Sequence, residues 1–156
     1  MTADAKEQTT LERALGTVSQ AMTREVVLLA ADISAETALR RLDEKAVSGA
    51  PVVDHGRVVG VVTRRDLLVP TLLDDPTGIQ ATLPGQHSPR LAQLKVGELM
   101  SADLVAAQPD WPVLRAVRAM IANGVNRLPV VDQAGRPLGV LTRDDALRAI
   151  AGGDKG

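Results

Sequence analysis

The fold is decided by residues 50–66, which read APVVDHGRVVGVVTRRD. Two valine-rich runs flank His55-Gly56, and this pattern predicts a β-hairpin with strands at Pro51–Val53 and Val58–Val62. The second run ends in Thr63-Arg64-Arg65-Asp66, where a hydroxyl residue followed three positions later by an acid predicts the start of a helix. The stretch therefore predicts two strands and a helix that leaves the end of the second strand.

The same pattern occurs a second time at residues 128–145, which read LPVVDQAGRPLGVLTRDD. The match extends back to Val18, which corresponds to Val96, so the offset between the copies is 78 residues. The second hairpin turns through Gln133-Ala134-Gly135 and is one residue longer, which raises the offset to 79. A repeat of this kind divides the chain into two copies of one structural unit.

Each copy is predicted to have the order β-α-β-β-α. A short helical turn ends at Met22 or Met100, a strand follows at 26–29 or 104–107, and a helix comes next. In the first copy this helix starts near Ser34. Its apolar face is predicted to hold Ala35, Ala38, Leu39, Leu42 and Ala46.

In the second copy, Asp110 is expected to cap the corresponding helix, and Pro112 suits its first turn. Its apolar stripe is predicted to hold Val113, Val117, Met120 and Ile121. Gly49 and Gly124 stand where the chain is expected to turn out of the two helices.

One copy alone would be marginally stable, because small domains bury a smaller fraction of their surface on folding than large ones. We therefore expect an α/β (α+β) fold in which two tandem units pack sheet to sheet with pseudo-twofold symmetry. The predicted organisation is an N-terminal helical extension (1–17), repeat 1 (18–69), a connector (70–95), repeat 2 (96–150) and a flexible tail (151–156).

The composition argues against several classes of protein. The net charge of −1 and the single aromatic residue, Trp111, argue against a nucleic-acid partner, which requires basic side chains and stacking platforms. The absence of cysteine removes disulfides and thiolate chemistry and fits a reducing compartment. Neither a signal peptide nor a long apolar span is visible, so the expected location is the cytoplasm, without membrane insertion. The excess of arginine over lysine and the abundance of alanine are typical of a GC-rich bacterial genome.

With PVVD and GV(V/L)TxxD present in both copies at matching spacing, the chain resembles the CBS domain pair, also called a Bateman module. The resemblance covers Val18 to Ile150. It implies clefts between the two sheets that bind AMP, ADP, ATP, S-adenosylmethionine or a related adenosyl ligand. It also implies a disc-shaped homodimer that senses its ligand and acts on a separate, unknown effector protein.

The candidate ligand-binding residues begin with the repeated Thr-x-x-Asp. A ribose offers two neighbouring hydroxyl donors, and the carboxylate of Asp66 or Asp145 offers two acceptors at a matching separation. The hydroxyl of Thr63 or Thr142 and the free N–H groups of the helix start are suited to a phosphate. The same motif is also close to a capping box, a purely structural arrangement that is compatible with ligand binding.

Further candidates surround these motifs. Arg64 and Arg143 stand in the first turn of a helix, where a cation is unfavourable unless an anion lies nearby, although each is equally an ordinary solvated side chain. Arg127 is a candidate for reaching a phosphate, and because its counterpart is Gly49 the two clefts cannot be equivalent. The resemblance places an apolar slot for adenine at Val27, Ala50, Pro51, Val105, Leu128 and Pro129.

Two functions remain open from the sequence. The first is a non-catalytic regulatory module that needs no cofactor and binds an adenosyl ligand. The second is a ligand-free dimerisation or interaction module with degenerate clefts. An enzyme is not expected, because no nucleophile, metal set or acid–base pair stands out.

Overall fold

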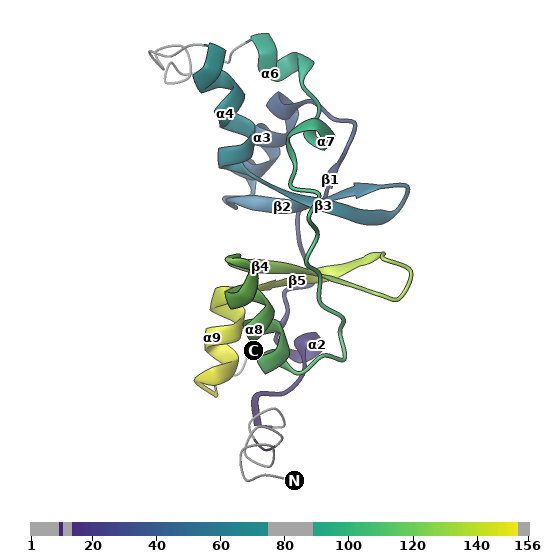
Figure 1. Cartoon of the computed structure of the whole chain (residues 1–156), viewed down its shortest axis with the longest axis vertical. Coiled ribbons are helices and arrows are strands. Elements are labelled where there is room, and N and C mark those ends of the chain that lie inside the picture. Colours follow the sequence, from purple (N-terminus) through teal and green to yellow (C-terminus); the bar gives the residue numbers. More distant parts are fainter. Residues whose placement is uncertain (1–9, 11–13, 75–88, 153–156) are drawn as a thin grey trace. The chain divides into compact units, whose positions relative to one another are not determined.

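The structure is a computed structural model that describes residue 10, residues 14–74 and residues 89–152 (Figure 1). Most of the predicted N-terminal extension, the middle of the predicted connector and the end of the predicted tail lie outside the described residues. Leu15, at the end of the predicted extension, packs against a hydrophobic core. At the end of the connector, the chain forms the short helix α6 (Pro89–Gln93).

The chain divides into two compact units, and neither unit is one copy of the repeat. Unit 2 is residues 27–104, whereas unit 1 combines residues 1–26 with residues 105–156. The helical turn α2 (Val18–Ala21) therefore belongs with the body of the second copy, and its counterpart α7 (Val96–Leu99) with the body of the first. The repeat predicts the order of the elements but not this exchange of their first segments.

Unit 2 contains a three-stranded sheet in the order β1-β2-β3. The strands are β1 (Leu29–Ala30), β2 (Gly49–Asp54) and β3 (Arg57–Thr63). The antiparallel pair β2-β3 confirms the predicted hairpin. His55 and Gly56 at its turn have φ angles of 52° and 77°, as a type I′ turn requires. The strand predicted at 26–29 is shorter and later, because only Leu29 and Ala30 pair with β2.

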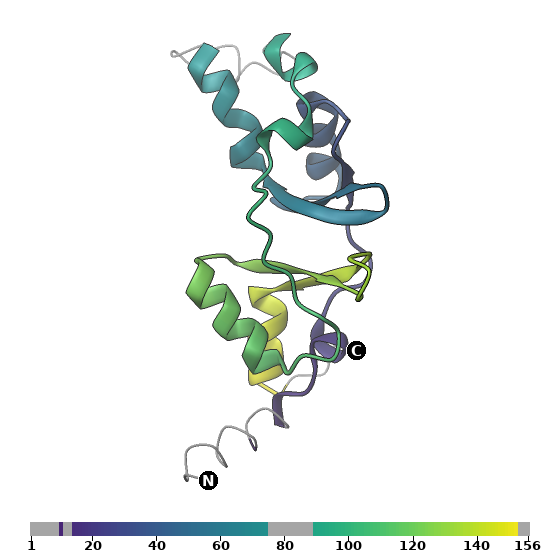
Figure 2. The ribbon, with the colours of Figure 1, turned by 45° about the vertical axis from the view of Figure 1, so that its right-hand side comes forward.

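Helices α3 (Ala35–Glu44) and α4 (Arg64–Asp74) lie on one face of this sheet (Figures 1 and 2). The Oγ of Ser34 accepts a hydrogen bond from the Thr37 amide at 3.1 Å, so α3 begins where the sequence predicts. Its predicted apolar face is buried except at Ala46. The prediction for Ala46 is wrong because α3 ends at Glu44 and Ala46, with a φ of 53°, makes the turn expected at Gly49.

Unit 1 contains the antiparallel pair β4 (Arg127–Val131) and β5 (Pro137–Thr142), with helices α8 (Val113–Asn123) and α9 (Arg143–Ile150) on one face (Figure 1). The strand predicted at 104–107 is reduced to a single bridge from Ala107 to Val130. Gly124 closes α8 with a left-handed φ of 62°, as predicted.

Two predictions for α8 are wrong. The residue before its first turn is Pro112, so Asp110 lies too far upstream to cap the helix, and no side chain caps it. Ile121 was placed on the buried stripe but is 77% exposed. Val113 and Met120 are buried as expected, so the true core-facing stripe is narrower than the sequence pattern.

Each unit has its own hydrophobic core, and the helical turn exchanged from the other copy, α2 or α7, is buried in it. Val18 is fully buried in the core of unit 1, and its counterpart Val96 is fully buried in the core of unit 2. Burying one such side chain contributes about 1.5–3 kcal/mol, so each segment is anchored mainly by apolar contact. The mixed α and β class predicted for the fold is confirmed in both units.

Backbone pairing continues this anchoring at equivalent places. Thr23 pairs with Val140 of β5 through two hydrogen bonds of 2.9 Å, and Ser101 pairs with Val61 of β3 through bonds of 3.1 and 2.9 Å. A Cβ built on Gly139 would lie 2.5 Å from the carbonyl oxygen of Thr23, and one built on Gly60 would lie 2.5 Å from that of Ser101. The two glycines thus permit a backbone approach that any other residue would obstruct.

None of the described helices is both long enough and apolar enough to cross a membrane.

Candidate functional site

Both Thr-x-x-Asp motifs lie where a strand passes directly into a helix, β3 into α4 and β5 into α9. In unit 2, Asp66 Oδ2 accepts from the Thr63 amide at 2.9 Å, and the Asp66 amide donates to Thr63 Oγ1 at 3.2 Å. In unit 1 the corresponding bonds between Thr142 and Asp145 are both 3.1 Å. Each motif therefore forms a capping box, the structural alternative considered above, and each box uses one carboxylate oxygen, Oδ2.

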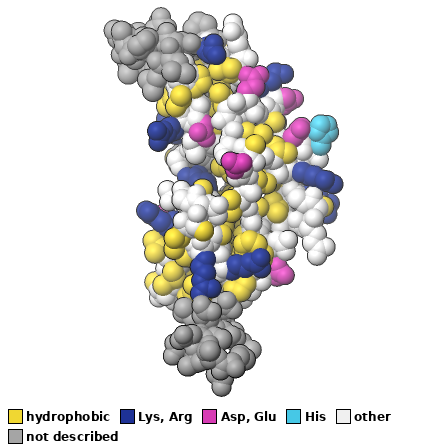
Figure 3. Space-filling model, viewed as in Figure 1, with side chains coloured by type: hydrophobic (Ala, Val, Ile, Leu, Met, Phe, Trp, Pro, Cys, Tyr) yellow, Lys and Arg dark blue, Asp and Glu magenta, His cyan; other side chains and the backbone are white. Residues whose placement is uncertain are grey.

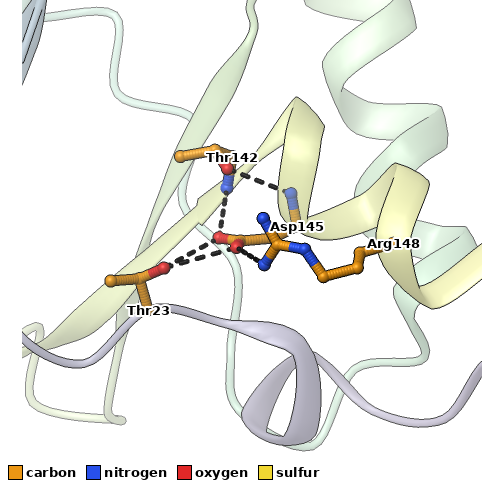
Figure 4. A network of polar contacts seen from close by, with 4 residues as sticks. All are labelled: Thr23, Thr142, Asp145 and Arg148. Atoms are coloured by element: carbon orange, nitrogen blue, oxygen red, sulfur yellow. Dashed lines mark hydrogen bonds and ion pairs between the residues drawn. The ribbon is translucent and has the colours of Figure 1, made fainter. Parts of the chain in front are cut away.

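The carboxylate of Asp145 has further partners, shown in Figure 4. Thr23 Oγ1 donates to Oδ1 at 3.3 Å and to Oδ2 at 3.2 Å, and the guanidinium of Arg148 lies 3.3 Å from Oδ1. Only 4% of Asp145 is exposed. The buried charge is thus compensated by a backbone amide, a hydroxyl and a cation, as a buried carboxylate requires.

Asp66 has a different environment although its motif is the same. It is half-buried, and among the described residues its Oδ1 has no hydrogen-bond partner. The counterpart of Thr23 is Ser101, which is exposed and pairs with Val61 through its backbone. The counterpart of Arg148 is Val69, which has no hydrogen to donate from its side chain. One oxygen of Asp66 therefore remains available to a ligand within the described part of the chain.

The candidate arginines also differ between the units. Arg64 is paired with Asp43 at 2.7 Å, and both side chains are about half exposed. Arg143 is exposed, and the position equivalent to Asp43 in its unit is occupied by Ile121, which cannot form an ion pair. These contacts do not show that either arginine binds a phosphate, so the role of both in binding stays a prediction.

Arg127 is the first residue of β4, and its register partner is Thr142. It is half-buried, and burial lowers the pKa of its guanidinium from the usual value of 12.5. The group remains a cation because arginine does not lose its proton in proteins. At the equivalent place in unit 2, Gly49 is the partner of Thr63. The strand register therefore shows the predicted difference between the two motifs. Thr142 has a cation beside it, whereas Thr63 has a glycine, which has no side chain.

The apolar candidates are mostly core residues. Ala50 and Leu128 are almost completely buried, and they belong to the cores of unit 2 and unit 1 respectively. Their neighbours Pro51 and Pro129 are buried as well. Val27 and Val105 are half-buried at the edges of the same cores. Only the last two retain side-chain surface in their own unit that an adenine ring is able to contact.

A groove that the sequence did not predict lies between α8 and α9 and measures about 390 Å³. Its lining is largely apolar and includes Ile121, Leu147 and Ile150, which are 77%, 54% and 51% exposed. Arg143 provides the cation among its lining residues. Figure 3 shows hydrophobic side chains gathered over these helices. Exposed apolar surface of this kind is typical of an interaction site.

Sequence reasoning missed Thr23, Arg148 and Ser101. The repeat alone shows that Thr23 and Ser101 are equivalent residues, because they follow the matching methionines Met22 and Met100. The contact from Thr23 to Asp145 was not visible, because it joins residues 122 positions apart. Within the described residues no cluster of three or more His, Cys, Asp or Glu side chains is arranged to hold a metal ion.

Comparison with known proteins places these motifs in a family. The CBS domain family matches residues 18–69 and 96–152. A CBS domain-containing protein of Dictyostelium discoideum is 34% identical over 134 residues, which cover 83% of this chain and 88% of that protein.

Similar solved structures include two with a bound nucleotide. CBSX2 of Arabidopsis thaliana in complex with AMP has a TM-score of 0.69 and 30% identity, and the match covers 88% of this chain and 97% of that one. The cytosolic domain of the Mg²⁺ channel MgtE in complex with ATP has a TM-score of 0.63 and 31% identity, over 81% of this chain and 45% of that one.

Proposed function

The chain belongs to the CBS domain family, and on that premise we propose that it is a non-catalytic regulatory module that binds an adenosyl ligand and signals to a partner protein. Support comes from relatives of the same fold that bind AMP and ATP. The proposal assigns no chemical step to the chain.

The observation that carries the proposal is the Thr-x-x-Asp motif at the junction of strand and helix in both units. Capping occupies only Oδ2 of the aspartate, so the motif stabilises the helix start without using its whole hydrogen-bonding capacity. In our proposal the carboxylate oxygen that capping does not use accepts from a ribose hydroxyl. The threonine hydroxyl then faces the phosphate or its equivalent. The amides of the first and third helix residues already donate, to Ser48 or Asn126 and to the motif threonine, so they are not the proposed phosphate donors.

The remaining candidates divide by charge and polarity. Arg127, beside Thr142, is the cation best held in place, because it is half-buried on a strand. Arg64 is able to exchange its exposed pairing with Asp43 for a phosphate at little cost, since exposed ion pairs contribute about 0–1 kcal/mol. Val27 and Val105 are the proposed contacts for adenine, which would then rest against aliphatic side chains.

A thermal-shift experiment tests the proposal. AMP, ADP, ATP and S-adenosylmethionine are each added to the full chain at increasing concentration. A ligand at about 100 times its dissociation constant stabilises the folded state by about 2.7 kcal/mol. For a chain of this size that corresponds to a rise in Tm of about 5–10 °C. No shift with any of the four compounds would overturn the proposal.

A matched variant shows whether the effect arises at the motif. Asp144→Ala removes an exposed acid beside the motif of unit 1 and is expected to retain the full shift. The double variant Asp66→Ala/Asp145→Ala removes both proposed ribose contacts and is expected to lose it. A shift that survives the double variant would place the ligand elsewhere.

The groove between α8 and α9 favours a second candidate function, an interaction module that works by dimerisation or by binding its effector protein. Its three exposed aliphatic residues supply the apolar centre that a protein interface needs. Analytical ultracentrifugation of the chain with and without Ile121→Asp tests this candidate. Self-association that the substitution weakens would support it, whereas a monomer at all concentrations would exclude a homodimer through this groove.

A further inference from the structure

The two Thr-x-x-Asp motifs are identical in sequence pattern but not in what their carboxylates already hold. This difference bears on where the ligand of the proposed function binds, and the inference below rests on that function. Because both capping boxes use Oδ2, the comparison reduces to the other oxygen, Oδ1 of Asp66 and Oδ1 of Asp145.

Oδ1 of Asp145 is already occupied. It accepts from Thr23 Oγ1 at 3.3 Å and contacts the guanidinium of Arg148 at 3.3 Å, while Thr23 also reaches Oδ2 at 3.2 Å (Figure 4). A ribose diol would have to displace the hydroxyl and the cation from a carboxylate that is only 4% exposed. Arg148 is 47% exposed and is able to regain water, but the half-buried hydroxyl of Thr23 would lose its acceptor, so the exchange is unfavourable.

Oδ1 of Asp66 has no competitor among the described residues. The side chain is half-buried, and Oδ2 alone is used, by the Thr63 amide at 2.9 Å. Ser101 replaces Thr23 and makes only backbone bonds to Val61, and Val69 replaces Arg148. A diol therefore gains hydrogen bonds to Asp66 without breaking any that the described chain makes.

We propose that the ribose of the adenosyl ligand is bound by Asp66 alone and that the chain takes one ligand through its two motifs. Asp145 is a structural tether between the segment that carries Thr23 and helix α9. Thr23 and Arg148 are positioning residues. They contact no ligand, and they prevent ribose binding at the second motif because they already contact the Asp145 carboxylate.

The test is isothermal titration of the full chain with AMP, ADP, ATP and S-adenosylmethionine, using the most tightly bound of the four for the variants. The matched pair is Asp66→Asn and Asp145→Asn, because an amide keeps the acceptor oxygen of the capping box and both variants should remain folded. One ligand per chain is expected for the unmodified protein. Asp66→Asn is expected to weaken binding at least tenfold, and Asp145→Asn less than threefold, since a lost contact of about 1.4 kcal/mol corresponds to tenfold in affinity.

A second pair of variants tests the positioning residues. Thr23→Val/Arg148→Met removes the two side chains that contact Oδ1 of Asp145 and is expected to raise the stoichiometry from one ligand to two per chain. Ser101→Ala, at the position equivalent to Thr23, is the control and is expected to leave one ligand per chain.

The outcomes separate the two proposals. Binding of none of the four compounds to the unmodified chain would overturn the proposed function. Binding of two ligands per chain, or a loss of binding in Asp145→Asn but not in Asp66→Asn, would overturn the present inference and leave the function standing. A stoichiometry that stays at one in Thr23→Val/Arg148→Met would show that these side chains do not close the second motif.

Discussion

The hydroxyl of Thr23 donates to both carboxylate oxygens of Asp145, which lies 122 positions further along the chain. The same threonine pairs with Val140 through its backbone. Main chain and side chain of one residue thus attach the N-terminal segment to the β5–α9 junction. The equivalent residue in unit 2, Ser101, is attached by its backbone alone among the described contacts.

Truncating the two motif aspartates should therefore affect stability unequally. Asp66→Ala removes a cap and should lower the free energy of unfolding by about 1 kcal/mol. Asp145→Ala also leaves Thr23 and Arg148 without their acceptor and should lower it by about 3 kcal/mol. Urea unfolding followed by circular dichroism measures both. Asp144→Ala, an exposed neighbour, should stay within about 0.5 kcal/mol, and equal losses for Asp66 and Asp145 would contradict the assigned network.

Alanine in place of Gly139 or Gly60 should destabilise the chain. The new Cβ would lie 2.5 Å from a backbone oxygen, that of Thr23 or Ser101, and a backbone cannot move aside as a flexible side chain does. We expect each substitution to cost about 1–3 kcal/mol, the usual range for overpacking. Gly97→Ala is the control, because its Cβ would be 3.2 Å from the nearest oxygen, and its loss should be smaller. Thermal denaturation of the three variants in parallel provides the measurement.

Ile121→Asp should be tolerated. Asp43 occupies the equivalent position in unit 2 and pairs with Arg64 at 2.7 Å, so an aspartate at 121 would lie near Arg143 in the same way. Ile121 is 77% exposed, and an exposed ion pair contributes little, so the free energy of unfolding should change by less than about 0.5 kcal/mol. Urea unfolding at low protein concentration checks this. A loss of about 2 kcal/mol or more would mean that Ile121 is a core residue after all.

Asp132 should stabilise the second hairpin in a pH-dependent way. The Arg136 amide bonds to its carboxylate at 2.9 Å and is the main cause of its pKa lying below the ordinary 3.8, with the Arg136 guanidinium and the Ala134 amide also contributing. Because the folded pKa is depressed, the ionised group stabilises the fold above its ordinary pKa, and that stabilisation is lost as the pH falls through the folded pKa.

Unfolding of Asp132→Asn and the unmodified chain should be compared from neutral pH down to about pH 3. The variant should be less stable at neutral pH, and the difference should shrink once the pH falls below 3.8. Asp54→Asn in the first hairpin is the control, since the Asp54 carboxylate contacts His55 at 3.0 Å on an exposed turn. A difference that grows on acidification would contradict the assignment.

The sequence predicted those features that depend on neighbouring residues. The turn at His55-Gly56, the start of α3 at Ser34 and the end of α8 at Gly124 follow from local chemistry, and the structure has all three. Asp110 and Ile121 were misplaced for a related reason. Several starts and faces fit the pattern of α8, and packing in the folded unit decides among them.

The inequality of the two motifs was only partly predictable. The aligned repeats show that Arg127 and Gly49 occupy equivalent positions. The register of the strands confirms that each lies beside a motif threonine. The greater difference, the closed carboxylate of Asp145, depends on a tertiary contact with Thr23 that no local pattern encodes. Identical motifs thus acquire different environments through residues outside them.

The exchange of first segments has a consequence for the order in which the chain acquires its structure during synthesis. Unit 2 is one continuous stretch, residues 27–104, so it has all its parts before the rest of the chain is made. Unit 1 needs residues from both ends, and Val18 has no core to enter until β4, β5 and α9 have emerged from the ribosome. The segment that carries Val18 is therefore translated before unit 2 but reaches its final place after it, and a nascent chain that stalls after unit 2 would carry this apolar segment exposed.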